Sequence, residues 1–184
     1  DCNSDYIYLT EKLVELKGKK LRKKKNLISQ FKRICPKYSV EKLSEEYNET
    51  CIELAKRWFR DQTKVKDEDK QLELDVMRRA LYNQDKIGLE GILIFDRELL
   101  IAFTLFSEQR PDMATIHFEK FDYSYKGAAQ IVNQETAICL KDRYKYLNRE
   151  QDMCKRGLRK SKLSYDPVKI AVTYKLLFRP RKTT

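Results

Sequence analysis

The sequence predicts an α/β fold in which helices flank a mixed, mostly antiparallel β-sheet. Stretches that alternate apolar and polar residues, typical of strands, are interspersed with stretches of helical period. The apolar stretch 89–108 is divided by Asp96–Leu99, which can form a turn between two antiparallel strands. A predicted helix over 126–143 then lies between two later strands, and a crossover helix of this kind joins strands of a mixed sheet.

The first 36 residues are predicted to form a basic helical arm. Residues 5–9 alternate and suit a short strand or an extended segment. Thr10 is a good N-cap for a helix that Gly18 can end. A second helix precedes Pro36, with lysines on one side and an apolar stripe on the other, made of Leu21, Leu27, Ile28, Phe31 and Ile34.

Residues 37–184 are predicted to form one domain. Its expected elements, in order, are a strand at 38–44, helices at 44–62 and 67–85, two strands within 89–108, a strand at 112–122, a helix at 126–143, a strand at 144–150, a helix at 156–167 and a strand at 168–178. No repeat or long linker interrupts this order.

Charge is distributed unevenly along the chain. The net charge is +11, and the stretch from Leu16 to Val40 holds ten basic residues and no acidic one. Such a field attracts polyanions, for example tRNA or an anionic surface. A solvated basic face is the alternative. The candidate polyanion-binding residues are Lys19, Lys20, Arg22, Lys23, Lys24 and Lys25.

Composition predicts a cytoplasmic protein. The sequence has no apolar run of the roughly 18 residues that a transmembrane helix needs, and it does not open with a signal-peptide pattern. Its five cysteines form no C-x-x-C pair and show no metal-ligand spacing, so reduced thiols and no metal site are expected.

The element order resembles that of the GNAT superfamily of acyltransferases. In that superfamily a loop of pattern R/Q-x-x-G-x-G/A binds a pyrophosphate at a helix N-terminus, where backbone amides favour an anion. The corresponding stretch here has Ser at the first position, which puts acetyl-CoA binding in question. Gly127 alternatively serves tight helix packing. The candidate phosphate-binding residues of this loop are Ser124, Lys126, Gly127, Ala128 and Ala129.

A closer resemblance covers nearly the whole chain. The motifs "GLEGILIF", "IHFEKFDYSYKGAAQIVNQE" and "YLNREQD…GLRKSKLSYDPVK", together with residues 5–28, resemble a bacterial family related to the C-terminal domain of phosphatidylglycerol lysyltransferase. The resemblance implies a GNAT-like fold. Relatives, including the Fem-type peptidyl transferases, move an amino acid from aminoacyl-tRNA to an amine or hydroxyl of a lipid or peptide.

Two departures from the family pattern bear on function. Members often carry a further GNAT-like domain upstream, so the chain is either a single-domain version or the second half of a longer one. The family usually has Leu-Gly and then acidic residues after the stretch equivalent to "REQD", whereas Met153–Arg156 stands here and makes the site more basic.

The polar run "NREQD" after the apolar strand at 144–150 is the strongest candidate for an active site. In a GNAT-like sheet this strand diverges from the one at 112–122, and acyl transfer would occur in the gap. By strand alternation, Glu119 and His117 should share a face. The candidate catalytic residues are Glu119, Asn148, Glu150 and Tyr165, and Arg149, Arg159 and Lys162 could hold a phosphate or carboxylate.

Each of these residues also has a structural interpretation. "NREQD" could form an ion-pair network with Arg159 and Lys162, and Asn148 could cap a turn. His117 is more typical of a structural histidine.

Three functions fit the sequence. The first is an acyl or aminoacyl transferase that uses aminoacyl-tRNA and an amine or hydroxyl acceptor. The second is an acyl-CoA-dependent N-acyltransferase. The third is a non-catalytic module that binds RNA or an anionic surface. The sequence favours an enzyme, with the donor as substrate and no certain cofactor, and it does not determine the donor, the acceptor or the oligomeric state.

Overall fold

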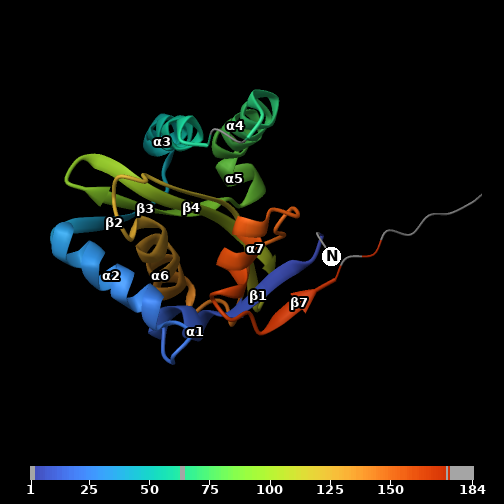
Figure 1. Ribbon diagram of the computed structural model, residues 1–184. Helices are drawn as coiled ribbons and strands as arrows, with labels where there is room; N and C mark the ends of the chain where they lie inside the picture. The colour runs from blue at the N-terminus through green and yellow to red at the C-terminus, as the bar shows by residue number, and fades with distance from the viewer. Residues whose placement is uncertain (1–2, 63–64, 173, 175–184) are drawn as a thin grey trace, which may run out of the picture.

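The computed structural model describes residues 3–62, 65–172 and 174, and it confirms the predicted mixed sheet flanked by helices (Figure 1). Seven strands lie in the order β2-β3-β4-β5-β6-β1-β7. They are β1 (Asp5–Leu9), β2 (Tyr38–Lys42), β3 (Glu90–Asp96), β4 (Leu99–Arg110), β5 (Met113–Phe121), β6 (Tyr146–Asn148) and β7 (Lys169–Ala171). The predicted last strand extends past residue 171, where only part of the chain is described.

The helices are α1 (Thr10–Glu15), α2 (Arg22–Ile34), α3 (Asn48–Arg60), α4 (Asp67–Leu81), α5 (Gln84–Ile87), α6 (Ala128–Leu140) and α7 (Arg156–Leu163), with a short 3₁₀ turn at Glu45–Tyr47. The helix predicted over 67–85 is two helices, because the chain turns at residues 82 and 83.

The strands β2 to β5 pair antiparallel in chain order, and the crossover through α6 makes β6 parallel to β5. Strand β1 lies between β6 and β7 and is antiparallel to both. The sheet is thus mostly antiparallel with one parallel pair.

Helices α1, α2 and α6 cover one face of the sheet, called here the α6 face, and α3 and α4 lie over the opposite α3 face (Figure 1). On the α6 face, Ile28 and Phe31 of α2 pack with Ile131 of α6 and Ile94 of β3. On the α3 face, Leu54 and Met77 pack against strand residues such as Phe103. Burial of these side chains is the main source of stability.

The N-terminal segment is part of the domain. Tyr6 and Tyr8 of β1 and Leu13 of α1 belong to the core of the α6 face. The prediction that residues 1–36 form an appended arm is therefore wrong for the part of the segment that the structure describes. The prediction arose because the lysines on the outer side of α2 dominate the composition, whereas its apolar stripe meets α6.

Two further properties concern composition. Among the described residues, no helix combines the length and the apolar character required to cross a bilayer.

Cys35, Cys51 and Cys139 are free thiols, whereas Cys154 is disulfide-bonded, so the expectation of reduced thiols is wrong at Cys154.

Candidate active site

Strands β5 and β6 are paired over only three residues each. Met113–Thr115 of β5 pair with Tyr146–Asn148 of β6, and β5 then continues to Phe121 without this partner. The chain after Asn148 stays bonded to β1, since the Arg149 amide donates to the Tyr6 carbonyl and the Tyr6 amide donates to the Glu150 carbonyl. The two strands therefore diverge at the point where "NREQD" begins.

A β-bulge decides which side chains of β5 face each side of the sheet. Leu105 of β4 lies opposite Phe118, but the next residue, Phe106, lies opposite Ile116, so His117 is the extra residue. Ile116 packs in the core of the α6 face and Phe118 against that of the α3 face. The prediction that Glu119 and His117 share a face is therefore wrong, because the bulge reverses the alternation between them.

Glu119 and Arg149 form the centre of a polar cluster on the α6 face. Nη2 of Arg149 lies 2.8 Å from Oε2 of Glu119, and the side chains are 13% and 19% exposed. The guanidinium carbon lies 5.8 Å from the ring centre of Tyr8 and 5.1 Å from that of Tyr165. Arg149, Glu119, Tyr8, Tyr165, Lys24 and Lys162 are called here the Arg149 cluster.

The cluster carries more positive than negative groups. Nζ of Lys24 lies 4.3 Å from the ring centre of Tyr165, and burial lowers the pKa of Lys24. Nζ of Lys162 donates to the carbonyl oxygens of Arg149 and Glu150, while burial and the Arg149 charge lower the pKa of Lys162 to about 8. Since Glu119 is the one carboxylate among these six residues, the cluster favours an anion or a polarised oxygen.

Two buried polar atoms of the cluster lack a hydrogen-bond partner of good geometry among the described residues. They are Nη1 of Arg149 and the hydroxyl of Tyr165. Burial raises the pKa of Tyr165 to about 12, although Arg149 opposes the shift. Buried polar groups are nearly always satisfied, so these two atoms are candidates for a contact with a bound water or a ligand.

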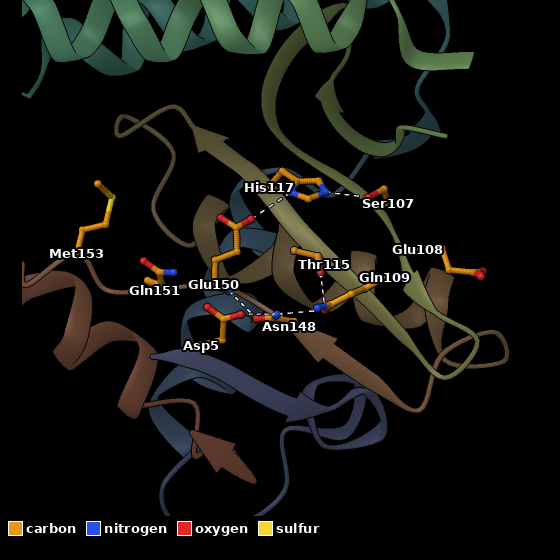
Figure 2. A pocket seen from close by; sticks show the side chains of 10 residues that line it. All are labelled: Asp5, Ser107, Glu108, Gln109, Thr115, His117, Asn148, Glu150, Gln151 and Met153. Carbon is orange, nitrogen blue, oxygen red and sulfur yellow. Dashed lines mark hydrogen bonds and ion pairs between the residues drawn. The ribbon is translucent and has the colours of Figure 1, made fainter. Parts of the chain in front are cut away.

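An open cavity of about 530 Å³ lies on the α3 face beside the same strand gap (Figure 2). His117 lies between two partners there. Its Nδ1 is 3.1 Å from Oε1 of Glu150, and its Nε2 is 2.8 Å from Oγ of Ser107. The lining residues are Asp5, Ser107, Glu108, Gln109, Thr115, His117, Asn148, Glu150, Gln151 and Met153.

Asn148 lines this cavity and makes three side-chain hydrogen bonds. Its Nδ2 donates to Oδ2 of Asp5 at 2.8 Å and to Oε1 of Gln109 at 3.2 Å, and its Oδ1 accepts from the Glu150 amide at 2.8 Å. Thr115 donates to the same Gln109 oxygen. Glu150 has φ +54°, a left-handed conformation that is unusual for a residue with a long side chain. The bond from the Glu150 amide to Asn148 holds this turn.

The "NREQD" run thus divides between two sides of the sheet. Asn148 and Glu150 line the cavity, whereas Arg149 points into the cluster. Asp152 is fully buried and accepts from Tyr6 and from Nε of Arg159, at 2.7 and 2.5 Å. Arg159, predicted to hold a phosphate or carboxylate of a ligand, is therefore paired with Asp152 of the protein itself. The active-site interpretation thus describes the positions of Asn148 and Glu150, and the ion-pair interpretation describes that of Asp152.

Gly127 is covered by α2. It has φ +93°, and a Cβ on it would lie 2.5 Å from the carbonyl oxygen of Leu27 and 2.9 Å from Cβ of Phe31. Gly127 and Ala128 are buried, and the Ala128 amide donates to the Tyr125 carbonyl. The predicted phosphate cradle at Gly127 and Ala128 is therefore closed by packing. Ser124 and Lys126 are exposed, Ser124 donates to Asp122, and Ala129 is half-buried.

Five of the six predicted polyanion-binding residues are exposed, and one packs inward. Lys19, Lys20, Arg22, Lys23 and Lys25 are exposed, and Lys20 pairs with Asp166 at 2.7 Å. Lys24 turns inward to the ring of Tyr165. A basic surface, defined here as the five exposed residues, therefore borders the Arg149 cluster through Lys24.

Sequence reasoning missed Ser107 and Tyr8 and treated His117 as structural. The pairing of Ser107 with His117 depends on the register of β4 and β5, which a bulge sets. The position of Tyr8 depends on β1 joining the sheet beside β6. Neither relation follows from residue periodicity within one element.

Comparison with known proteins gives one family and several structures of the same fold. Residues 1–176 match the family described as phosphatidylglycerol lysyltransferase, C-terminal. A conserved protein of unknown function from Bacteroides thetaiotaomicron is 34% identical, with a TM-score of 0.84 over 92% of this chain and 57% of that one. A comparison with curated proteins finds no match.

Two more distant structures share the fold. The C-terminal domain of a putative lysylphosphatidylglycerol synthetase from Agrobacterium fabrum is 14% identical, with a TM-score of 0.64 over 92% of this chain and 58% of that one. A ribosomal-protein-alanine N-acetyltransferase from Brucella melitensis biovar Abortus 2308 is 14% identical, with a TM-score of 0.55 over 77% of this chain and 99% of that one. The chain thus spans somewhat over half the length of the first two structures.

Proposed function

Because the chain belongs to the phosphatidylglycerol lysyltransferase C-terminal family and has a GNAT-like fold, we propose that it transfers an aminoacyl group from aminoacyl-tRNA to an amine or hydroxyl acceptor on a lipid or peptide. The observation that carries the proposal is the buried Nη1 of Arg149 at the gap between β5 and β6, which has no hydrogen-bond partner among the described residues. A carbonyl oxygen placed there would be stabilised as it gains charge.

The donor lies on the α6 face in this proposal. Arg149 binds the carbonyl oxygen of the donor ester, and Glu119 keeps the guanidinium in place through its ion pair. Tyr165 gives a proton to the leaving oxygen, because its hydroxyl is protonated at neutral pH and Arg149 beside it opposes the rise in pKa that burial causes. Lys24 and the basic surface next to it would contact phosphates of the tRNA.

The acceptor enters from the cavity on the α3 face. Asn148 and Glu150 face it there, and Glu150 takes the proton that the attacking amine or hydroxyl loses. Donor and acceptor would meet in the gap beyond Thr115, where β5 has no strand partner in β6. Holding both in one geometry lowers the entropic part of the barrier.

The two alternatives have weaker support. An acyl-CoA donor needs a pyrophosphate cradle, and α2 packs against Gly127 at the place where the superfamily has one. A purely binding module does not need an open cavity at the gap or an unsatisfied buried guanidinium nitrogen.

The experiment compares two donors with the same protein. Aminoacyl-tRNA and acyl-CoA, each carrying a radiolabelled acyl group, are incubated with an extract of bacterial lipids or with simple amines. We expect label to leave the tRNA in an acceptor-dependent manner and to remain on CoA. Transfer from CoA instead would select the second function, and retention of tRNA without transfer would select the third.

Tyr165→Phe tests the assigned proton donor. Within the described part of the chain its hydroxyl has no hydrogen bond of good geometry, only an approach to Gln130, so the change should leave stability nearly equal while turnover falls about 100-fold or more. Tyr38→Phe is the matched control. The Tyr38 hydroxyl lies outside the site and donates a hydrogen bond of 2.7 Å to Glu135. That variant should lose about 1 kcal/mol of stability and keep its turnover.

A further inference from the structure

Ser107 and His117 have no part in the transfer reaction proposed above, and they form a hydrogen-bonded arrangement with Glu150, which the transfer reaction shares. The three side chains stand in line at the wall of the cavity, and they come from β4, from β5 and from the segment that follows β6 (Figure 2). The His117 side chain is 33% exposed and that of Glu150 is 46% exposed. All three are therefore accessible to a molecule in the cavity.

The partners of His117 assign a neutral tautomer, because an ionised carboxylate can only accept. Nδ1 of His117 then carries the proton and donates to Glu150 over 3.1 Å. Nε2 is then the acceptor, and the Ser107 hydroxyl donates to it over 2.8 Å. A serine bonded to a histidine that a carboxylate orients is the arrangement that activates a serine nucleophile.

Two backbone irregularities position these side chains. The β-bulge turns His117 toward the cavity instead of the α6 face. Glu150 takes a left-handed conformation that its amide bond to Asn148 supports. Backbone irregularities of this kind concentrate at functional sites, because the surrounding structure must stabilise them.

We propose that Ser107 is a nucleophile that cleaves carboxylic esters through an acyl-serine intermediate, with His117 as base and Glu150 as its orienting group. The activity goes beyond the proposed transfer, because it requires neither a tRNA nor an amine acceptor. The substrate class is an ester whose acyl group fits an open cavity of about 530 Å³.

The chemical steps balance with water as the second reactant. Oγ of Ser107 bonds to the ester carbonyl carbon as its proton passes to Nε2 of His117. The bond from that carbon to the alcohol oxygen then breaks, and Nε2 returns the proton to the departing alcohol. Water attacks the acyl-serine by the same route, which releases the acid and restores the Ser107 hydroxyl.

A donor for the developing oxyanion is present on the same face. Gln109 is two residues from Ser107 on β4 and lines the same cavity. Its carbonyl oxygen accepts from Thr115 and from Asn148, which orients the carboxamide. Its amide group therefore serves as the hydrogen-bond donor to the oxyanion in this proposal.

The test uses the unmodified chain with p-nitrophenyl acetate and, separately, a fluorophosphonate probe. We expect steady release of p-nitrophenol and a mass increase on the peptide that contains Ser107. Ser107→Ala and His117→Gln should each lower the release rate about 100-fold or more, and Glu150→Gln should lower it less. Ser44→Ala is the control, since Ser44 donates to a carboxylate, Glu46, without a histidine. It should keep the full rate.

Two results would overturn the proposal: an unchanged rate in Ser107→Ala, whatever the rate in His117→Gln, or a probe adduct on other residues but not on Ser107. Thermal melting of each variant shows that it is folded. Failure here leaves the proposed transfer intact, because that reaction is tested by Tyr165→Phe on the other face of the sheet.

Discussion

Glu119 and Glu150 lie on opposite sides of one sheet and differ in what surrounds them. Glu119 is mostly buried and bonded to a buried arginine, whereas Glu150 is half-exposed and meets a histidine at a cavity wall. An uncompensated buried charge is costly, but a solvated one is not. The same chemical change therefore has different consequences at the two positions.

Glu119→Gln should reduce the free energy of unfolding by about 3 kcal/mol, because Arg149 keeps its buried charge without a counterion. Glu150→Gln should change it by less than about 0.5 kcal/mol while turnover falls by up to about 100-fold. Urea denaturation of both variants measures the difference. Equal losses of stability would show that Glu150 belongs to a structural network.

Asp152 gives the protein a specific acid sensitivity. Hydrogen bonds from Arg159 and Tyr6 lower the pKa of Asp152 well below its usual range. A carboxylate with a depressed pKa in the folded state contributes stability above its unfolded pKa, near 4, and this contribution is lost as the pH falls toward the folded pKa.

Asp152→Asn should therefore lower the melting temperature at pH 7, and the gap to the unmodified protein should narrow below about pH 4. Melting curves between pH 7 and pH 2 measure the gap. Asp85→Asn, on the exposed surface of α5, is the control and should show no gap. A gap that stays constant to pH 2 would contradict the assignment.

At the residue level, Asn148 and Glu150 are candidates because polar side chains at the end of an apolar strand are unusual, and Glu119 is a candidate from the alternation of the neighbouring strand. The sequence does not separate them by side. One bulged residue in β5 decides that Glu119 and His117 face opposite ways, and bulges depend on pairing with β4.

At the level of elements, the start of α6 shows a structural role for a motif that resembles a ligand loop. Gly127 combines a positive φ with contact to the backbone of α2. Glycine tolerates both conditions because it has no Cβ. Packing of α2 over α6 therefore depends on this residue, in agreement with the alternative that Gly127 serves tight helix packing.

Gly127→Val should destabilise the fold by at least about 2 kcal/mol, because the left-handed backbone and the contact with Leu27 both oppose a side chain. Gly157→Ala is the matched control. Gly157 lies on exposed α7, and a Cβ built on it would meet open space. Alanine there should raise the free energy of unfolding by about 0.5–1 kcal/mol. Chemical denaturation compares the two, and a stable Gly127→Val would restore the open-cradle interpretation.

The helices were predictable because their apolar stripes follow the helical period and pack inward, as α2 and α3 show. The place of β1 was not predictable. Its five residues look the same in a strand and in an extended segment, and its partners, residues 146–148 and 169–171, lie far away in the chain.

At the level of the whole molecule, basic charge borders the proposed donor side. The basic surface should bind tRNA in a salt-dependent manner, because each neutralised phosphate releases counterions. Lys24 is unsuitable for a charge test, since it packs on Tyr165. Lys19, Lys23 and Lys25 are exposed and can be changed without disturbing the core.

Changing these three lysines together to glutamine should reduce the slope of log K against log salt by up to about 2 to 3. The control changes Lys56, Lys66 and Lys86, which are exposed on the part of the chain that forms α3 to α5. Filter binding of tRNA at several salt concentrations gives both slopes. An equal reduction in both variants would assign the effect to net charge alone.

The insertion of β1 between β6 and β7 has a consequence for how the protein is made. Translation proceeds from the N-terminus, so residues 5–9 leave the ribosome long before residues 146–148 and 169–171, which supply both their hydrogen-bonding partners. At about 5–20 residues per second, β1 waits on the order of ten seconds with both edges unpaired. The hairpins of β3, β4 and β5 can form before residues 146–171 have emerged, but the half of the sheet that carries Arg149 and Glu150 closes only after residues 169–171 have left the ribosome. An exposed strand edge can pair with other chains, so β1 is the part of the described sheet that is open to such pairing for the longest time.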